Sequence, residues 1–216
     1  MVVQLPLVFD PVAINYAETV LAALEKASVR RALLNMGGPL PPEPVGVPYI
    51  DARRLLADRL PDAVESAWFF GPAGPYLENL LQPWSMRRVR ERGELVYPLP
   101  GTLALPWMTL DDIGDAMAGA LSGVWRPRMN LLSGPQPIDG DTIAEAVTAA
   151  AGRDVRWVQV TPDEYQPLLA TVIGAAVAAN VIAHAAAPTV PPAEMVRPGP
   201  TTIEQWALRQ DWEGRR

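Results

Sequence analysis

The sequence predicts an α/β protein in which a parallel sheet is followed by a smaller C-terminal α/β lobe. The prediction begins with Val2–Phe9, an apolar run rich in strand-forming residues that stops at Asp10 and Pro11. Ala13–Ala27 then has apolar residues at the spacing of an amphipathic helix, and Arg31–Asn35 is a second short strand. A strand, a helix and a further strand in this order form a unit whose strands run parallel through a right-handed crossover.

The segment Gly37–Pro48 contains five prolines and three glycines, so it is expected to be an ordered loop without regular structure. A helix over Asp51–Leu60 and a third strand over Ala63–Phe70 follow, which completes the order strand, helix, strand, helix, strand. Ligands of such sheets bind at the carboxyl ends of the strands, where the proline-rich loop begins. This loop is therefore the first candidate for a binding site.

The pattern changes after Phe70, and we expect two interleaved lobes with bounds 1–73 and 74–216. The second lobe begins with a Pro/Gly turn and one helix through the Glu78 to Arg92 region. Thr109 or Asp111 is expected to cap the next helix, which runs to Leu121. The other elements are an extended piece at Glu94–Leu99, strand Met129–Leu132, helix Ile143–Ala151, strand Val155–Val160, a helix from Pro162, and a terminal helix near Thr201 and Thr202 that carries Trp206.

Composition limits the classes of function. The 216 residues are 49% hydrophobic, enough to bury a core, and the net charge of −6 disfavours nucleic acid as a partner. The chain has no cysteine, and its sole histidine, His184, has no second ligand at metal-site spacing, so no metal is expected. Leu168–Ala187 is as long as a membrane span, but it is alanine-rich and contains Asn180, so we expect a buried or interface helix and no membrane. Pro6 interrupts the apolar N-terminus, so no signal peptide is expected and the predicted location is the cytoplasm.

Several short sequence motifs are spread along the chain. The most distinctive is Tyr76–Leu81, of the type Y-x-E-N-L-L, and the others are Val3–Val8, Asn35–Pro39, Trp107–Ile113, Ser133–Pro135, Ala151–Val155 and Thr202–Trp206. In these motifs the chain resembles the NmrA-like branch of atypical short-chain dehydrogenases. The resemblance implies a Rossmann domain with a small substrate lobe. It also implies relatives that include NAD(P)H-dependent reductases, isomerase-like enzymes and redox-sensing regulators, so the family alone does not settle the function.

The resemblance makes Val2–Phe9 the fourth strand of the family's sheet. The chain is then expected to be a truncated Rossmann-like protein that lacks the N-terminal glycine-rich half. No G-x-x-G-x-x-G, and no G-x-G-x-x-G after a strand, occurs in the sequence. We therefore expect NAD(P) to bind weakly, with contacts at Pro6 and Asn35. The edge of Val2–Phe9 would be bare, which predicts a homo-oligomer or a hetero-complex along this strand.

One pair of residues has the spacing of a catalytic pair. Short-chain dehydrogenases use a serine, a tyrosine and, four residues later, a lysine that lowers the tyrosine's pKa. Tyr49 and Arg53 have this spacing and are the candidate catalytic residues. The place of the serine falls on Gly37 or Gly38, and arginine suits the lysine's task poorly because its pKa is high. The alternative is a surface tyrosine beside a helix start at Asp51.

A second set of residues is expected to line a cleft between the lobes and to bind a small-molecule substrate. Tyr76, Glu78 and Asn79 follow the third strand, where the resemblance places this cleft. The alternative for Glu78 and Asn79 is a structural role, in which they cap a helix and tie the loop above it. The complete predicted set is Asn35, Met36, Gly37, Gly38, Tyr76, Glu78 and Asn79.

Two kinds of function follow from these observations. The leading hypothesis is an NmrA-like protein that binds a small apolar or aromatic molecule, or a partner, and does little redox chemistry itself. The alternative is an active enzyme. It would be either an NAD(P)H-dependent reductase completed by another chain or a cofactor-free isomerase or cyclase that uses Tyr76, Glu78 and Asn35. A third reading is that the true start of the protein lies upstream of Met1.

Overall fold

The computed structural model describes residues 1–123, 128–185 and 191–214. They form two compact units. Unit 1 contains Met1–Ala73, Ile113–Leu132 and Pro191–Arg197, and unit 2 contains Gly74–Asp112, Ser133–Val190 and Pro198–Arg216. The chain therefore leaves unit 1 after Ala73 and returns to it with two later segments.

Unit 1 is built on a five-stranded sheet in the order β1, β2, β3, β5, β7. Its strands are β1 (Val2–Val3), β2 (Arg31–Asn35), β3 (Ser66–Pro72), β5 (Met129–Ser133) and β7 (Val196–Pro198). The first four pair in parallel, and Leu33 of β2 lies between Val2 of β1 and Trp68 of β3. Parallel neighbours need crossover connections, and α1 (Val12–Lys26) and α2 (Pro48–Ala63) supply the first two. The predicted α/β class is confirmed.

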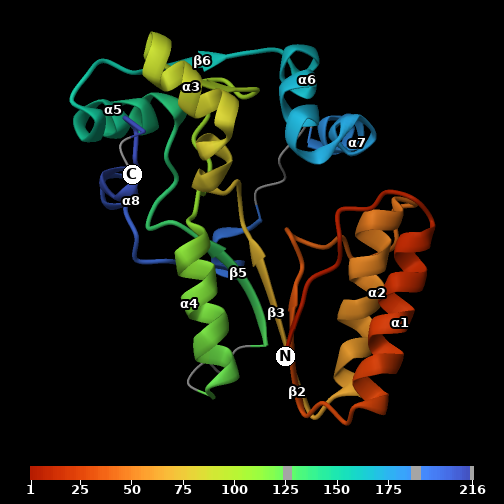
Figure 1. Cartoon of the computed structure of the whole chain (residues 1–216). Coiled ribbons are helices and arrows are strands. Elements are labelled where there is room, and N and C mark those ends of the chain that lie inside the picture. Colours follow the sequence, from red (N-terminus) through yellow and green to blue (C-terminus); the bar gives the residue numbers. More distant parts are fainter. Residues whose placement is uncertain (124–127, 186–190, 215–216) are drawn as a thin grey trace. The chain divides into compact units, whose positions relative to one another are not determined.

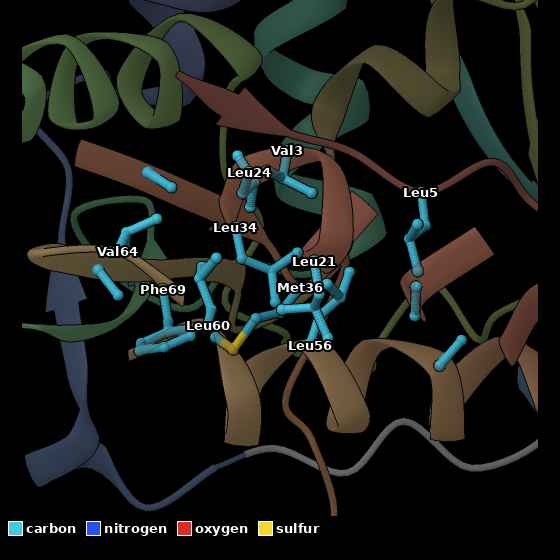
Figure 2. Packing of buried hydrophobic residues seen from close by; sticks show 14 of the residues in the cluster. Val3, Leu5, Leu21, Leu24, Leu34, Met36, Leu56, Leu60, Val64 and Phe69 are labelled. Atoms are coloured by element: carbon cyan, nitrogen blue, oxygen red, sulfur yellow. The ribbon is translucent and has the colours of Figure 1, made fainter. Parts of the chain in front are cut away.

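Helices α1 and α2 lie side by side (Figure 1) and bury the core of unit 1 against the sheet. Side chains alternate along a strand, so Ala32, Leu34 and Met36 point to the same face of the sheet. Figure 2 shows this packing, in which the labelled residues are Val3, Leu5, Leu21, Leu24, Leu34, Met36, Leu56, Leu60, Val64 and Phe69. Part of α4 (Leu110–Leu121) and the short helix η2 (Ala193–Met195) also belong to unit 1.

The first strand is much shorter than expected. The prediction of a strand over Val2–Phe9 is wrong beyond Val3, where β1 ends. Pro6 cannot donate to a ladder, Val8 N–H donates to the Pro6 carbonyl in a turn, and the Leu5 carbonyl accepts from a side chain of α2. β1 forms one end of the sheet and Val2 is 49% exposed. Association along this edge stays a prediction.

Unit 2 contains a two-stranded parallel sheet, in which β4 (Glu94–Tyr97) pairs with β6 (Arg156–Gln159). Its helices are η1 (Leu77–Leu81), α3 (Pro83–Arg92), α5 (Gly140–Ala151), α6 (Pro162–Ile173), α7 (Ala175–Ala185) and α8 (Ile203–Arg209). Residues from η1, α3, α5 and α8 form its core, including Leu80, Val89, Val147 and Trp206. Unit 2 is thus a second α/β unit, with a smaller sheet than that of unit 1.

Two long helices predicted from the sequence are each divided in two. The expected helix through Glu78–Arg92 separates into η1 and α3, because Pro83 has no N–H to continue η1 and takes a first-turn position in α3. The expected helix over Leu168–Ala187 separates into α6 and α7 at Gly174, whose φ is +83°, and its last two residues lie outside the described residues. Within the described ranges, no helix combines the length and apolarity that crossing a membrane requires.

The predicted helix starts are largely confirmed. Thr109 Oγ1 accepts a hydrogen bond from Asp112 N–H at 3.1 Å and so caps α4. Thr202 and Gln205 form a reciprocal capping box at the start of α8. α2 starts at Pro48, three residues before the predicted Asp51, so Tyr49 lies in its first turn.

Candidate functional site

The carboxyl ends of β2 and β3 form a rim with few side chains. Met36 N–H donates to the Phe70 carbonyl at 2.7 Å, which carries the pairing just beyond Asn35. A Cβ on Gly71 would lie 3.0 Å from the Gly38 oxygen, so the two backbones approach as closely as glycine allows. Gly37 has φ of +73°, a conformation that favours glycine. At this rim Gly37 is exposed, whereas Gly71 is buried against Gly38, at the edge where parallel sheets bind ligands.

The loop after β2 is ordered, as its composition predicts, and the helix that follows it provides the restraints. The Asp51 carboxylate accepts hydrogen bonds from Val45 N–H at 2.8 Å and Gly46 N–H at 2.9 Å. Arg54 donates to the Pro41 carbonyl at 2.8 Å and pairs with Asp58. Asp51 and Arg54 of α2 therefore hold the proline-rich loop in place through hydrogen bonds.

Tyr49 and Arg53 lie one turn apart on α2, as their spacing predicts. The guanidinium of Arg53 lies over the Tyr49 ring at 3.6 Å from its centroid, and the Phe9 ring stacks with Tyr49 at 4.9 Å between centroids. Both polar groups approach Gly37. A Cβ built there would be 3.1 Å from Tyr49 Oη and 3.5 Å from Arg53 Nε. The structure thus brings the predicted pair together with the glycine at the expected place of the serine.

Arg53 is buried, which the sequence analysis did not predict. Its side chain is 2% exposed and donates to the carbonyls of Leu5 and Tyr49, each at 2.9 Å. Desolvation lowers the pKa of the Arg53 guanidinium, and attraction to Tyr49 partly opposes this. The signal that could have revealed the burial is its position, since Arg53 shares a helical face with Leu56 and Leu60.

The other predicted residues of unit 1 differ in their surroundings. Pro6 is exposed in the loop after β1. Asn35 is half-buried, and its Oδ1 accepts from Gly37 N–H at 3.0 Å, which braces the start of the loop. Met36 is 2% exposed and packs in the hydrophobic core. Gly38 lies against Gly71 on the rim.

The predicted residues Tyr76, Glu78 and Asn79 belong to unit 2. Glu78 accepts from Leu110 N–H at the start of α4 and from Trp206 Nε1 in α8, each at 3.1 Å. Asn79 Nδ2 donates to Tyr97 Oη at 3.5 Å. Tyr76 bridges to Met108 through the backbone. That these three share a cleft with Asn35 stays a prediction.

Burial raises the pKa of the Glu78 carboxyl above its ordinary value of 4.5, although hydrogen bonds from the backbone and Trp206 oppose the shift. The folded state then binds this proton more tightly than the unfolded state does. As pH rises from 4.5 through the raised folded pKa, the free energy of unfolding is expected to fall relative to a Glu78→Gln variant. Urea unfolding at a series of pH values measures this, and parallel profiles for the two proteins would contradict it.

Unit 2 also contains a group of aromatic residues that the sequence analysis did not identify. Tyr97 is central, with ring centroids at 5.2 Å from Trp107, 5.8 Å from Trp157 and 5.5 Å from Tyr165. Trp84 meets Tyr165 edge-on at 6.0 Å. Burial raises the pKa of Tyr97 to about 12, so this phenol stays protonated at neutral pH. Seven tryptophans in 216 residues were the available signal.

Beside Trp107, unit 2 has a small cavity of about 180 Å³. Its lining is mainly apolar and comes from the turn after β5 and the start of α8: Leu77, Trp107, Gly134, Pro135, Gln136, Ile138, Thr201, Thr202, Ile203 and Glu204. None of the predicted site residues lines it. Within the described residues no cluster of three His, Asp or Glu side chains is placed to hold a metal ion.

Comparison with known proteins gives one relative in sequence and several in fold. No protein-family model matches the chain. It is 32% identical over 163 residues to an NAD(P)H azoreductase of Xenophilus azovorans, an alignment that covers 74% of this chain and 54% of the relative. The chain therefore spans about half the length of the curated relative that it matches.

Solved structures with 15–17% identity share the fold. A nucleoside-diphosphate-sugar epimerase of Staphylococcus aureus superposes with a TM-score of 0.68 over 96% of this chain and 75% of that chain, at 17% identity. A triphenylmethane reductase of Citrobacter sp. complexed with NADP(H) gives 0.67 over 96% and 74%, at 15% identity. The transcriptional regulator NmrA in complex with NAD gives 0.53 over 92% and 73%, at 17% identity.

Proposed function

Because the chain has the fold of the NmrA-like branch of NAD(P)-binding Rossmann proteins, as its short motifs predict, we propose that it acts in an NAD(P)H-dependent reductase. In this proposal the carboxyl rim of unit 1 holds the nicotinamide end of the dinucleotide. The observation that carries it is the exposed backbone of Gly37, with the Tyr49 hydroxyl 3.1 Å from the place that a Cβ would occupy. The cytoplasm is the proposed location.

The residues of the rim fit a nicotinamide nucleotide. A sugar or amide group needs donors and acceptors at an exposed backbone edge, and the rim offers the backbone of Gly37 and Gly38, the Asn35 amide and Tyr49 Oη. The bound nucleotide would supply the hydride. Tyr49 Oη would donate a hydrogen bond, and the restrained loop after β2 would orient the ring and exclude water.

The 216-residue chain by itself is expected to bind NAD(P)H weakly. The 216 residues contain no glycine-rich phosphate turn. Such a turn contributes two or three hydrogen bonds to charged phosphate oxygens, each worth roughly 1.5–3 kcal/mol. Without these hydrogen bonds, the Kd for NAD(P)H is expected to be higher by about a thousandfold or more.

We propose an aromatic acceptor as the substrate. The names of two related proteins specify azo and triphenylmethane reduction, and both compound types carry aromatic rings.

The test combines a binding and a turnover measurement on the 216-residue chain. Calorimetric titration with NADPH and NADH is expected to give a Kd of about 1 mM. At saturating NADPH, an azo dye is expected to accelerate NADPH oxidation. Tyr49→Phe should lower kcat/KM at least about tenfold because a hydrogen bond in the site is lost. Tyr16→Phe, on the exposed face of α1, is the matched control and should leave kcat/KM unchanged.

The two parts of this proposal fail separately. A micromolar Kd for NADPH would contradict weak binding and leave the reductase proposal intact. Absence of dye-dependent oxidation at saturating NADPH would contradict the reductase.

The second candidate function, a binding protein without redox chemistry, would then be preferred. One observation favours it, since counting along the sequence puts Gly37 or Gly38 where a short-chain dehydrogenase has its serine and Arg53 where it has its lysine.

A further inference from the structure

Arg53 is an unusual buried cation. Lys and Arg side chains are rarely buried to 2% exposure unless a carboxylate pairs with them. Across the described ranges, no Asp or Glu lies within ion-pair distance of its guanidinium. The hydrogen bonds from its terminal nitrogens end on the neutral carbonyls of Leu5 and Tyr49. The positive charge is therefore desolvated without a compensating negative charge.

The Nε–H of Arg53 has no acceptor in the described structure, although the nitrogen is fully buried. A buried donor without an acceptor costs about 1–3 kcal/mol, more when the group is charged. The unpaired donor lies beside the rim, because Nε is 3.5 Å from the place that a Cβ on Gly37 would occupy. A ligand oxygen that met this donor would recover the hydrogen bond and neutralise the charge.

The exposed Gly37 is the side from which such a ligand would approach the buried Nε. Gly37 is exposed, and apart from Gly37 itself and its two chain neighbours, the atoms within 4 Å of the place that a Cβ would occupy are Tyr49 Oη at 3.1 Å and Arg53 Nε at 3.5 Å. Both are hydrogen-bond donors and one carries a positive charge. A movement of the exposed Gly37 backbone would therefore open the buried Nε and the Tyr49 hydroxyl to a ligand at the carboxyl end of the sheet.

We propose that Arg53 and Tyr49 form a subsite for an oxyanion, a carboxylate, sulfonate or phosphate oxygen. The oxyanion belongs either to an acidic group on the aromatic substrate or to a phosphate of the nucleotide. The subsite goes beyond the proposed reductase activity, because an anion binds there whether or not hydride transfer occurs. The charge-assisted bond from Nε gives the larger contribution, and the Tyr49 hydroxyl adds a second bond.

The test uses inorganic sulfate and the 216-residue chain, at ionic strength held constant with chloride. Sulfate is expected to raise the unfolding midpoint of the wild type and of Arg59→Met, an exposed arginine on the same helix. In Arg53→Met the shift should disappear, with the Kd for sulfate raised at least tenfold. In Tyr49→Phe, which keeps the ring that stacks on Phe9 and Arg53, the Kd should rise severalfold.

A sulfate-induced shift of equal size in Arg53→Met, or no shift in the wild type, would overturn the proposal. If Arg53→Met fails to fold, Arg53→Lys replaces it, since lysine keeps the charge but has no Nε–H. Undiminished sulfate affinity in Arg53→Lys and Tyr49→Phe together would also overturn it. None of these readouts requires NADPH or turnover, so their failure is distinct from a failure of the reductase proposal.

Two further pairs of probes identify the source of the oxyanion. Benzenesulfonate compared with benzyl alcohol tests an acidic aromatic substrate. Nicotinamide mononucleotide compared with nicotinamide riboside tests a nucleotide phosphate. The pair whose anionic member binds more tightly in the wild type, and loses that advantage in Arg53→Met, identifies the ligand that the subsite takes.

Discussion

Replacing Trp206 with alanine is expected to lower the free energy of unfolding by about 3–5 kcal/mol. The indole is 2% exposed in the core of unit 2 and lies edge-on to Trp212, with ring centroids 5.7 Å apart. Its Nε1–H also donates to Glu78 Oε1. The change creates a cavity and leaves a partly buried carboxylate with one donor fewer. Urea unfolding followed by circular dichroism measures the loss.

Leu208→Ala is the matched control on the same helix, because Leu208 is 69% exposed. Its effect should stay within about 0.5 kcal/mol. Trp206→Phe retains most of the packing and removes the N–H, so it separates the two contributions. A loss below about 1 kcal/mol in Trp206→Ala would show that α8 contributes little to the stability of unit 2.

Replacing Asp112 with alanine is expected to cost about 3 kcal/mol, the second largest effect. Asp112 is 7% exposed, and its carboxylate accepts from Thr201 Oγ1 at 2.6 Å and Thr201 N–H at 3.1 Å. These bonds join the first turn of α4 to the segment before α8. The change leaves two buried donors without an acceptor, and each bond to a charged acceptor contributes roughly 1.5–3 kcal/mol.

Asp111 provides the control for this prediction. It is the preceding residue, its side chain is 78% exposed, and it approaches Arg209 only at 3.7 Å. Asp111→Ala should change the free energy of unfolding by less than about 1 kcal/mol, as exposed ion pairs do. Equal losses in the two alanine variants would indicate that helix N-terminal charge, which both residues supply, outweighs the Thr201 bridge.

Most of the fold follows from local patterns in the sequence. The strand Arg31–Asn35 has the predicted bounds, and α1 differs from its prediction by one residue at each end. Both elements have a clear hydrophobic pattern that ends abruptly, so the local sequence determines where they begin and end. The errors occur where one proline or glycine decides. Pro6 accompanies the early end of β1, Pro83 separates η1 from α3, and Gly174 separates α6 from α7.

The candidate site was predictable in part. The spacing of Tyr49 and Arg53 on one helical face and the ligand edge of a parallel sheet both follow from sequence periodicity. The surroundings of the residues do not. Glu78 follows a strand both in the sequence prediction and in the structure. Its hydrogen-bond partners Leu110 and Trp206, however, lie 32 and 128 residues away in the chain. Contacts over such separations leave no local pattern.

The sequence by itself determines the α/β class and a glycine- and proline-rich loop after the second strand, and it predicts the resemblance to the NmrA-like branch. Composition, periodicity and short motifs depend on neighbouring residues, and these are sufficient for that conclusion. Only the tertiary structure decides that Arg53 is a buried cation without a carboxylate in the described residues, with Nε facing Gly37. The physical reason is that desolvation and hydrogen-bond satisfaction depend on every group packed around a side chain, and the carbonyl of Leu5 reaches Arg53 from 48 residues away.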